Sequence, residues 1–145
     1  MKRRAFVQRL PVLTAGLATG GSAVMIGGCA SVPYLTPRLT PGGLSLYASE
    51  LSPEGDAFVQ APDMDRPVYI RRNESGSLTA VLAECTHQGC QPEPVGNRLE
   101  CPCHGSQFSF EGEVLAGPAE RPLTRYEVTE RDGEIVVRLP GGGAR

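Results

Sequence analysis

Two short stretches, Cys85-Thr86-His87-Gln88-Gly89-Cys90 (loop 1) and Cys101-Pro102-Cys103-His104-Gly105-Ser106 (loop 2), decide how this 145-residue chain folds and works. They hold four of its five cysteines and both of its histidines within 22 positions. Thiolates and imidazoles suit zinc, copper and iron–sulfur centres, whereas hard cations take oxygen ligands. The two loops therefore predict a soft-metal centre. Six candidate ligands are too many for one tetrahedral zinc ion, so some of them must have another role.

The pattern C-x-H-x-G-C followed by C-P-C-H-G-S resembles the cluster-binding loops of Rieske iron–sulfur proteins, specifically the disulfide-containing subgroup of cytochrome bc-type complexes. More loosely, the resemblance extends over residues 44–139. It implies one [2Fe–2S] cluster per chain, with two cysteines on one iron and two histidines on the other: Cys85, Cys101, His87 and His104. The remaining two cysteines of the loops would form a disulfide: Cys90 and Cys103. Such mixed ligation gives potentials of about −150 to +300 mV, against about −400 mV for all-cysteine plant-type clusters.

Four further features near the loops bear on function through the same resemblance. Ser106 stands where high-potential members direct a hydroxyl at a bridging sulfide, whereas the usual tyrosine two residues on is replaced by Phe108, which has no donor. Because hydrogen bonds to the sulfurs tune the potential, we expect a midpoint below that of quinol-oxidising relatives. Gln88 replaces an apolar docking residue, which weakens the case for quinol docking unless it is simply an exposed loop residue. Residues 117–123 resemble the proline-rich loop that covers the cluster.

Other kinds of centre remain open at this point. A structural zinc site formed by the same two cysteines and two histidines is chemically sensible. A catalytic Rieske oxygenase would need a second, mononuclear iron held by two histidines and a carboxylate. No histidine remains in the sequence to supply such a site.

Residues 1–29 have the features of a signal or anchor segment. Lys2-Arg3-Arg4-Ala5-Phe6-Val7 resembles a twin-arginine export motif, and an uncharged, glycine-rich apolar run follows over about residues 10–28. Twin-arginine export suits a protein that must cross the membrane already folded around a cluster, and a disulfide persists best in an oxidising compartment.

Cys29 ends this run in the stretch Ile26-Gly27-Gly28-Cys29, which resembles the processing box of bacterial lipoproteins. It is therefore a lipidation candidate. An uncleaved membrane anchor, or cleavage near Ala30 to give a soluble product, are the alternatives. We expect the protein on the periplasmic side of the bacterial cytoplasmic or outer membrane.

The rest of the chain predicts one all-β, Rieske-type domain over residues 44–140. Residues 30–43, with three prolines and two glycines, predict a tether, and residues 141–145 a flexible tail. Short alternating segments predict small antiparallel sheets with the loops at one end. The expected strands are 44–51, 68–71, 78–84, 107–110, 123–130 and 134–139. Arg131-Asp132-Gly133 predicts a hairpin turn between the last two.

Charge and motifs together predict an electron-transfer protein. Beyond residue 29 the chain has ten arginines and sixteen acidic residues, a net charge of −6 that argues against nucleic-acid binding. We expect an exported one-electron carrier in a membrane-associated respiratory complex of cytochrome bc type, with cytochrome b- or c-type partners and quinol as a further candidate. It would be a non-catalytic subunit of an oxidoreductase such as quinol–cytochrome c reductase. The alternatives are the small Rieske subunit of another periplasmic oxidoreductase, arsenite-oxidase-like with a large subunit as partner, and a stand-alone periplasmic Rieske protein.

Overall fold

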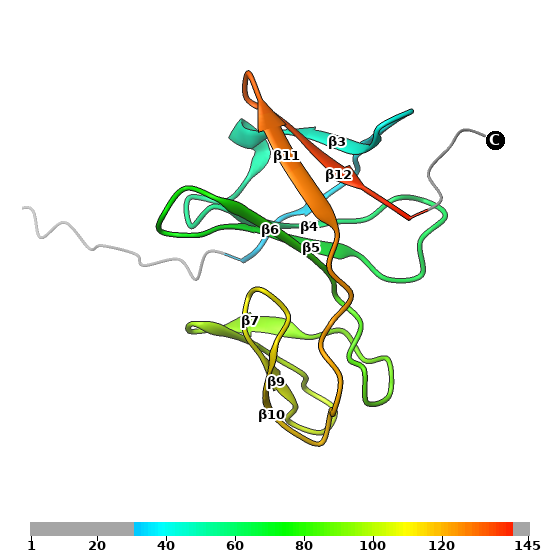
Figure 1. The fold of residues 1–145 in the computed structure, drawn as a ribbon, viewed down its shortest axis with the longest axis vertical. Helices are drawn as coiled ribbons and strands as arrows, with labels where there is room; N and C mark the ends of the chain where they lie inside the picture. Colours follow the sequence, from blue (N-terminus) through cyan, green and yellow to red (C-terminus); the bar gives the residue numbers. More distant parts are fainter. Residues whose placement is uncertain (1–30, 141–145) are drawn as a thin grey trace, which may run out of the picture.

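The computed structural model describes residues 31–140 (Figure 1). The twin-arginine motif, the apolar run, Cys29 and the tail 141–145 lie outside the described residues, so their predicted roles stay predictions. Within residues 31–140, no helix has the length and apolar character needed to cross a membrane.

Three four-stranded sheets and one short 3-10 helix, η1 (Ala48–Glu50), make up the described part of the chain. In spatial order, sheet A contains β1 (Tyr34–Leu35), β4 (Asp56–Val59), β5 (Val68–Arg72) and β6 (Leu78–Leu82). Sheet B contains β11 (Glu127–Arg131), β12 (Glu134–Arg138), β3 (Gly43–Tyr47) and β2 (Arg38–Thr40). Sheet C contains β10 (Val114–Ala116), β9 (Gln107–Phe108), β8 (Arg98–Glu100) and β7 (Glu93–Val95). Figure 1 shows sheets A and B together in the upper part of the molecule and sheet C in the lower part.

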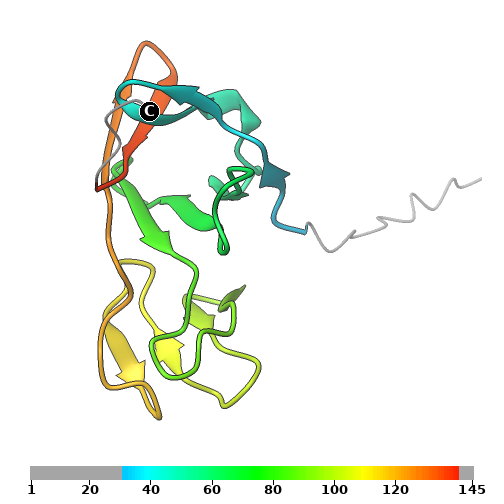
Figure 2. The same cartoon turned by 90° about the vertical axis from the view of Figure 1, so that its right-hand side faces the viewer.

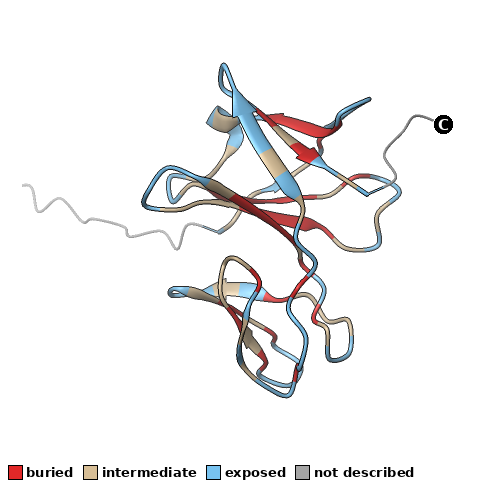
Figure 3. Cartoon of the chain, in the orientation of Figure 1, coloured by how far each residue is buried: buried red, intermediate tan, exposed pale blue. Residues whose placement is uncertain are grey.

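Sheet A is buried on both faces and separates two hydrophobic cores (Figure 3). Successive side chains of a strand point to opposite faces. On β5, Val68 and Ile70 therefore enter the core shared with sheet B (the base core), whereas Tyr69 enters the core shared with sheet C and the two loops (the loop core). The neighbouring strands repeat this division, with Val59 and Ala80 in the base core and Phe58 and Val81 in the loop core. Each fully buried side chain of this size contributes about 1.5–3 kcal/mol, so sheet A stabilises both parts.

The prediction of an all-β domain built of small antiparallel sheets is confirmed. All strand pairs are antiparallel except β1 with β4, among the residues that the structure describes. The predicted hairpin is also confirmed: Asp132 and Gly133 connect β11 to β12 with φ values of 52° and 77°, the positive pair typical of a two-residue type I′ turn.

The structure corrects the expected tether over residues 30–43. Tyr34–Leu35 forms β1, which pairs with β4, and Arg38–Thr40 forms β2, which pairs with β3. Both are short edge strands, and the three prolines of the segment, Pro33, Pro37 and Pro41, lie outside them. Proline and glycine content alone therefore did not distinguish a free segment from short edge strands.

Some strand boundaries also differ from the predicted ones. The first predicted strand, 44–51, is β3 followed by η1, and the strand predicted to begin at residue 123 begins at Glu127. Strand β4 was not predicted, although all four of its residues are buried. Because both of its faces are covered, it lacks the alternation of a half-buried strand.

Candidate metal centre

Loops 1 and 2 have the same backbone architecture. In loop 1, the Cys85 N–H donates to the Cys90 carbonyl (2.8 Å), and the Gly89 N–H donates to the Cys85 carbonyl (2.7 Å). Loop 2 repeats both bonds at the equivalent positions, at 2.8 and 2.9 Å. The fifth residue of each loop is a glycine with positive φ, 74° at Gly89 and 75° at Gly105, a conformation that costs other residues about 1–2 kcal/mol. Each loop thus presents its first cysteine at one end and its histidine in the turn.

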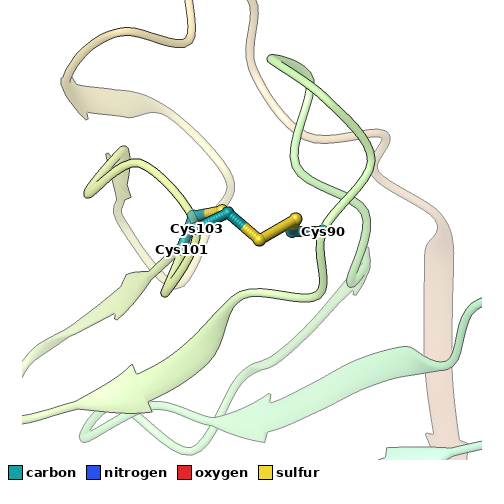
Figure 4. A group of neighbouring side chains, drawn as sticks. All are labelled: Cys90, Cys101 and Cys103. Atoms are coloured by element: carbon teal, nitrogen blue, oxygen red, sulfur yellow. A yellow bond between two sulfur atoms is a disulfide. The ribbon is translucent and has the colours of Figure 1, made fainter.

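A disulfide joins the two loops, as the resemblance implied. Cys90, the last residue of loop 1, is bonded to Cys103, the third residue of loop 2, with their Cα atoms 6.5 Å apart. The sulfurs of Cys90, Cys103 and Cys101 all lie within 4.8 Å of one another. Figure 4 shows the three side chains side by side. Because two of these three are consumed by the disulfide, they are not a metal-binding triad.

The reduced cysteines among the described residues are Cys85 and Cys101, the first residue of each loop. Both side chains are only 2% exposed and belong to the loop core. Burial raises the pKa of the Cys101 thiol, and the neighbouring Cys85 thiol raises it further. Backbone N–H groups of Cys103 and His104 that face this sulfur oppose the rise. These donors are already placed to stabilise negative charge on the sulfur, as a thiolate ligand requires.

The two histidines lie together on the surface. His87 and His104 are both exposed, and their ring centroids are 4.8 Å apart with the planes at 89°. The loops therefore bring together two buried thiols and two exposed imidazoles, a donor set with a protected side and an accessible side. This set fits a [2Fe–2S] cluster of mixed ligation, in which two sulfurs and two nitrogens are required.

Ser106 is fully buried, and its hydroxyl links loop 2 to the proline-rich segment 117–123. The Ala119 N–H donates to the Ser106 Oγ at 3.0 Å. A hydroxyl can accept and donate at the same time, so this bond leaves the Ser106 proton available to a second partner. Phe108, the other candidate tuning residue, is also fully buried and lies in the loop core.

A second link, which the sequence pattern did not predict, ties segment 117–123 to loop 1. The Thr86 hydroxyl donates to the Arg121 carbonyl at 2.5 Å, and the Arg121 guanidinium donates to the Thr86 carbonyl at 3.5 Å. The segment is thus bonded to both loops. No local pattern predicts a pair of residues 35 positions apart, so only the assembled fold shows it. Gln88, the candidate docking residue, is exposed beside His87.

A buried polar cluster supports the loop core from sheet A. The Tyr69 hydroxyl donates to the Asp56 Oδ2 at 2.7 Å, and the Arg71 guanidinium lies 3.4 Å from the same oxygen and 4.1 Å from the centroid of the Phe110 ring. Burial, followed by the hydrogen bond to Asp56, raises the pKa of Tyr69 far above its ordinary value. The Phe110 ring also lies 6.0 Å from that of Tyr69, so the turn between β9 and β10 packs on this cluster directly.

Comparison with known proteins identifies the domain type. Residues 44–127 match the family model of the Rieske [2Fe-2S] domain. The chain is 29% identical to the cytochrome b6-f complex iron-sulfur subunit of Chlorobaculum tepidum, over 95% of this chain and 76% of that protein. It is 36% identical to the corresponding subunit of Chlorobaculum thiosulfatiphilum, over 62% of this chain but 49% of that protein. The chain therefore spans about half the length of this second relative.

Solved structures agree with that match. The cyanobacterial plasma membrane Rieske protein from Synechocystis PCC 6803 aligns with a TM-score of 0.57 and 34% identity, over 64% of this chain and 95% of that one. The Sphingomonas yanoikuyae B1 ferredoxin aligns with a TM-score of 0.53 and 24% identity, over 65% of this chain and 94% of that one. This second likeness concerns the fold alone.

Proposed function

Because this chain belongs to the Rieske [2Fe–2S] family, we propose that it is an exported one-electron carrier whose cluster is bound by one cysteine and one histidine from each loop. The proposed ligands are Cys85, His87, Cys101 and His104. The observation that carries this assignment is the pairing of two reduced, buried thiols with two adjacent, exposed imidazoles in loops that a disulfide joins. When bound, the cluster supplies a couple that takes up and releases one electron.

The chain's own residues determine from which side a partner approaches. The thiols lie in the loop core, so no partner reaches them, whereas the imidazole rings are exposed. An electron donor or acceptor would therefore contact the surface around His87 and His104. The Cys90–Cys103 disulfide holds the two turns together, and a cross-link of this kind stabilises a fold by about 2–4 kcal/mol.

Two buried side chains bear on the potential of the centre: Ser106, the last residue of loop 2, and Phe108, two residues later. Ser106 would donate its free proton toward the cluster while it accepts the Ala119 N–H. Phe108 offers no such donor. We therefore expect a midpoint potential below that of quinol-oxidising family members but well above about −400 mV, the level of all-cysteine clusters.

For the partner, we propose a redox complex of cytochrome bc type, since the relatives described above are cytochrome b6-f complex iron-sulfur subunits. Quinol is a further candidate at the histidine surface, although the exposed Gln88 makes that surface more polar. Purification from native membranes with its bound partners tests this proposal. Recovery with a cytochrome b would support it, whereas recovery with a molybdenum-containing large subunit would replace it by the arsenite-oxidase-like alternative.

We further propose export by the twin-arginine route and anchoring at Cys29, on the sequence features given above. Mass spectrometry of the membrane fraction tests both. A mature chain that begins with a lipid-modified Cys29 would support the proposal, and an unmodified soluble chain would contradict it.

The ligand assignment is tested by replacing His87 or His104 with alanine. We expect each variant to lose most of its iron and the visible absorbance and electron resonance signal of a mixed-ligand cluster. The control is Gln88→Ala, a change in the same exposed turn, which should keep two iron atoms per chain. If a His87→Ala protein keeps its iron and its signal, or if the wild-type chain holds a single zinc ion, the assignment is wrong.

A further inference from the structure

The chain enters the domain through a segment that is built into both cores. The Phe58 N–H donates to the Pro33 carbonyl and the Gln60 N–H to the Leu35 carbonyl, each at 2.9 Å. Val32 packs against the loop core, and Leu35 packs against the base core. Residues 32–35, called the clasp below, therefore span the junction between the upper and lower parts of the molecule. Figure 2 shows β1, the short blue arrow, on one flank of the upper part of the molecule.

Tyr34 attaches the clasp to the metal-binding loops. Its ring stacks on Phe58, with centroids 4.9 Å apart, and its phenol oxygen accepts a hydrogen bond from the Gln91 side chain. Gln91 directly follows Cys90, the disulfide-bonded end of loop 1, and it also donates to Glu93 at 2.8 Å. The entering strand is thus bonded to β4 through its backbone and to the residue after loop 1 through the Tyr34 side chain.

We propose that the clasp joins the start of the domain rigidly to the metal centre, so that an anchor at Cys29 would hold the centre at a nearly fixed distance from the membrane. The proposal rests on the anchoring at Cys29 proposed above. From Cys29 to Val32 the chain takes three steps, which reach at most about 10 Å when fully extended. The fourteen residues of the segment 30–43, had they been free, would have reached roughly 40 Å or more.

A reach of about 10 Å is roughly a quarter of the reach that a free segment 30–43 would give. The flank that carries the clasp would therefore stay against the membrane, and the domain could not carry its histidine surface from a donor to a distant acceptor. Electrons would then reach a distant acceptor only by diffusion, either of the anchored protein in the membrane plane or of a redox partner that docks on exposed His87 and His104. A fixed assembly would instead have to place both partners around that one surface.

Hydrogen exchange in the full-length, membrane-extracted protein tests whether the clasp is closed. We expect the Phe58 and Gln60 amides to be protected, because their acceptors are the clasp carbonyls. Tyr34→Ala should speed exchange at both amides at least tenfold. Tyr47→Ala is the matched control, since Tyr47 is similarly exposed (50% against 58%) but lies on β3 in sheet B. Exchange of the wild-type Phe58 and Gln60 amides at the rate of an open strand edge would overturn the clasp.

The short reach is tested by inserting a flexible twelve-residue Gly/Ser linker between Ser31 and Val32 of the full chain. A fluorophore encoded at exposed Glu74 and acceptor-labelled lipids report the distance from domain to membrane. We expect a narrow distance distribution for the wild type and a clearly broader one with the linker. Equally broad distributions would overturn the rigid coupling. Failure of the wild type to associate with membranes would overturn the anchoring itself, and with it the short reach, while hydrogen exchange still decides the clasp.

Discussion

Removal of the Ser106 hydroxyl is the sharpest test of how segment 117–123 is held. Ser106 is completely buried and Ala119 is 3% exposed, so water cannot replace the lost acceptor. Ser106→Ala leaves the Ala119 N–H without its 3.0 Å partner, and a buried donor left unpaired costs about 1–3 kcal/mol. For a domain of this size, 1 kcal/mol lowers the unfolding midpoint by roughly 4–8 °C. We therefore expect Tm to fall by about 4–24 °C.

Two measurements on the same protein separate the hydrogen bond from other effects. Thermal unfolding gives Tm, and amide exchange at Ala119 reports the bond itself, which should be well protected in the wild type and at least tenfold less so in Ser106→Ala. The control is Ser49→Ala in η1, an exposed serine, for which we expect a change within about 0.5 kcal/mol. Equal Tm values for the two variants, with unaltered exchange at Ala119, would refute the reasoning. Iron content is measured alongside, because loss of a bound cofactor lowers Tm on its own.

Three further changes are predicted from the positions described above. Gly105→Ala should lower the free energy of unfolding in denaturant by about 1 kcal/mol, because φ is 75° there although no atom lies within 4 Å of the added Cβ. Gly42→Ala, where φ is ordinary, should lower it less, and equal losses of stability in the two variants would contradict the argument. Tyr69→Phe should make stability fall less steeply as pH rises above about 10. The fold favours the neutral phenol of Tyr69, so this phenol ionises first in the unfolded chain. Parallel curves of stability against pH for wild type and variant would exclude this. Phe108→Tyr should raise the midpoint potential by about 40 mV in a redox titration, the equivalent of one hydrogen bond of about 1 kcal/mol. An unchanged or lower midpoint potential would count against a tuning role of position 108.

The metal-binding loops could be predicted from the sequence because their chemistry is local. Each loop places a cysteine, a histidine and a glycine within five consecutive positions, and the structure repeats one backbone pattern in both. The Asp132-Gly133 turn is equally local, since the residues themselves favour positive φ. What depends on two or three neighbouring positions was therefore accessible without coordinates.

Features that depend on distant partners could not be predicted in the same way. Residues 30–43 have the composition of a linker, and only pairing with β3 and β4 makes strands of them. The Thr86–Arg121 bonds join residues that no spacing rule connects. Burial of Asp56–Val59 on both faces removes the alternation by which a strand is recognised.

Because neighbouring residues of β5 enter opposite cores, the packing of one part of the molecule cannot change independently of the packing of the other. A change of volume at Ile70 that shifts the strand also moves Tyr69, and with it the packing beneath Cys85 and Cys101. Redesign of the end remote from the loops would therefore also disturb the packing around the proposed ligands Cys85 and Cys101. Conversely, a graft of foreign loops onto this scaffold would succeed only if it left the Tyr69 side of β5 undisturbed.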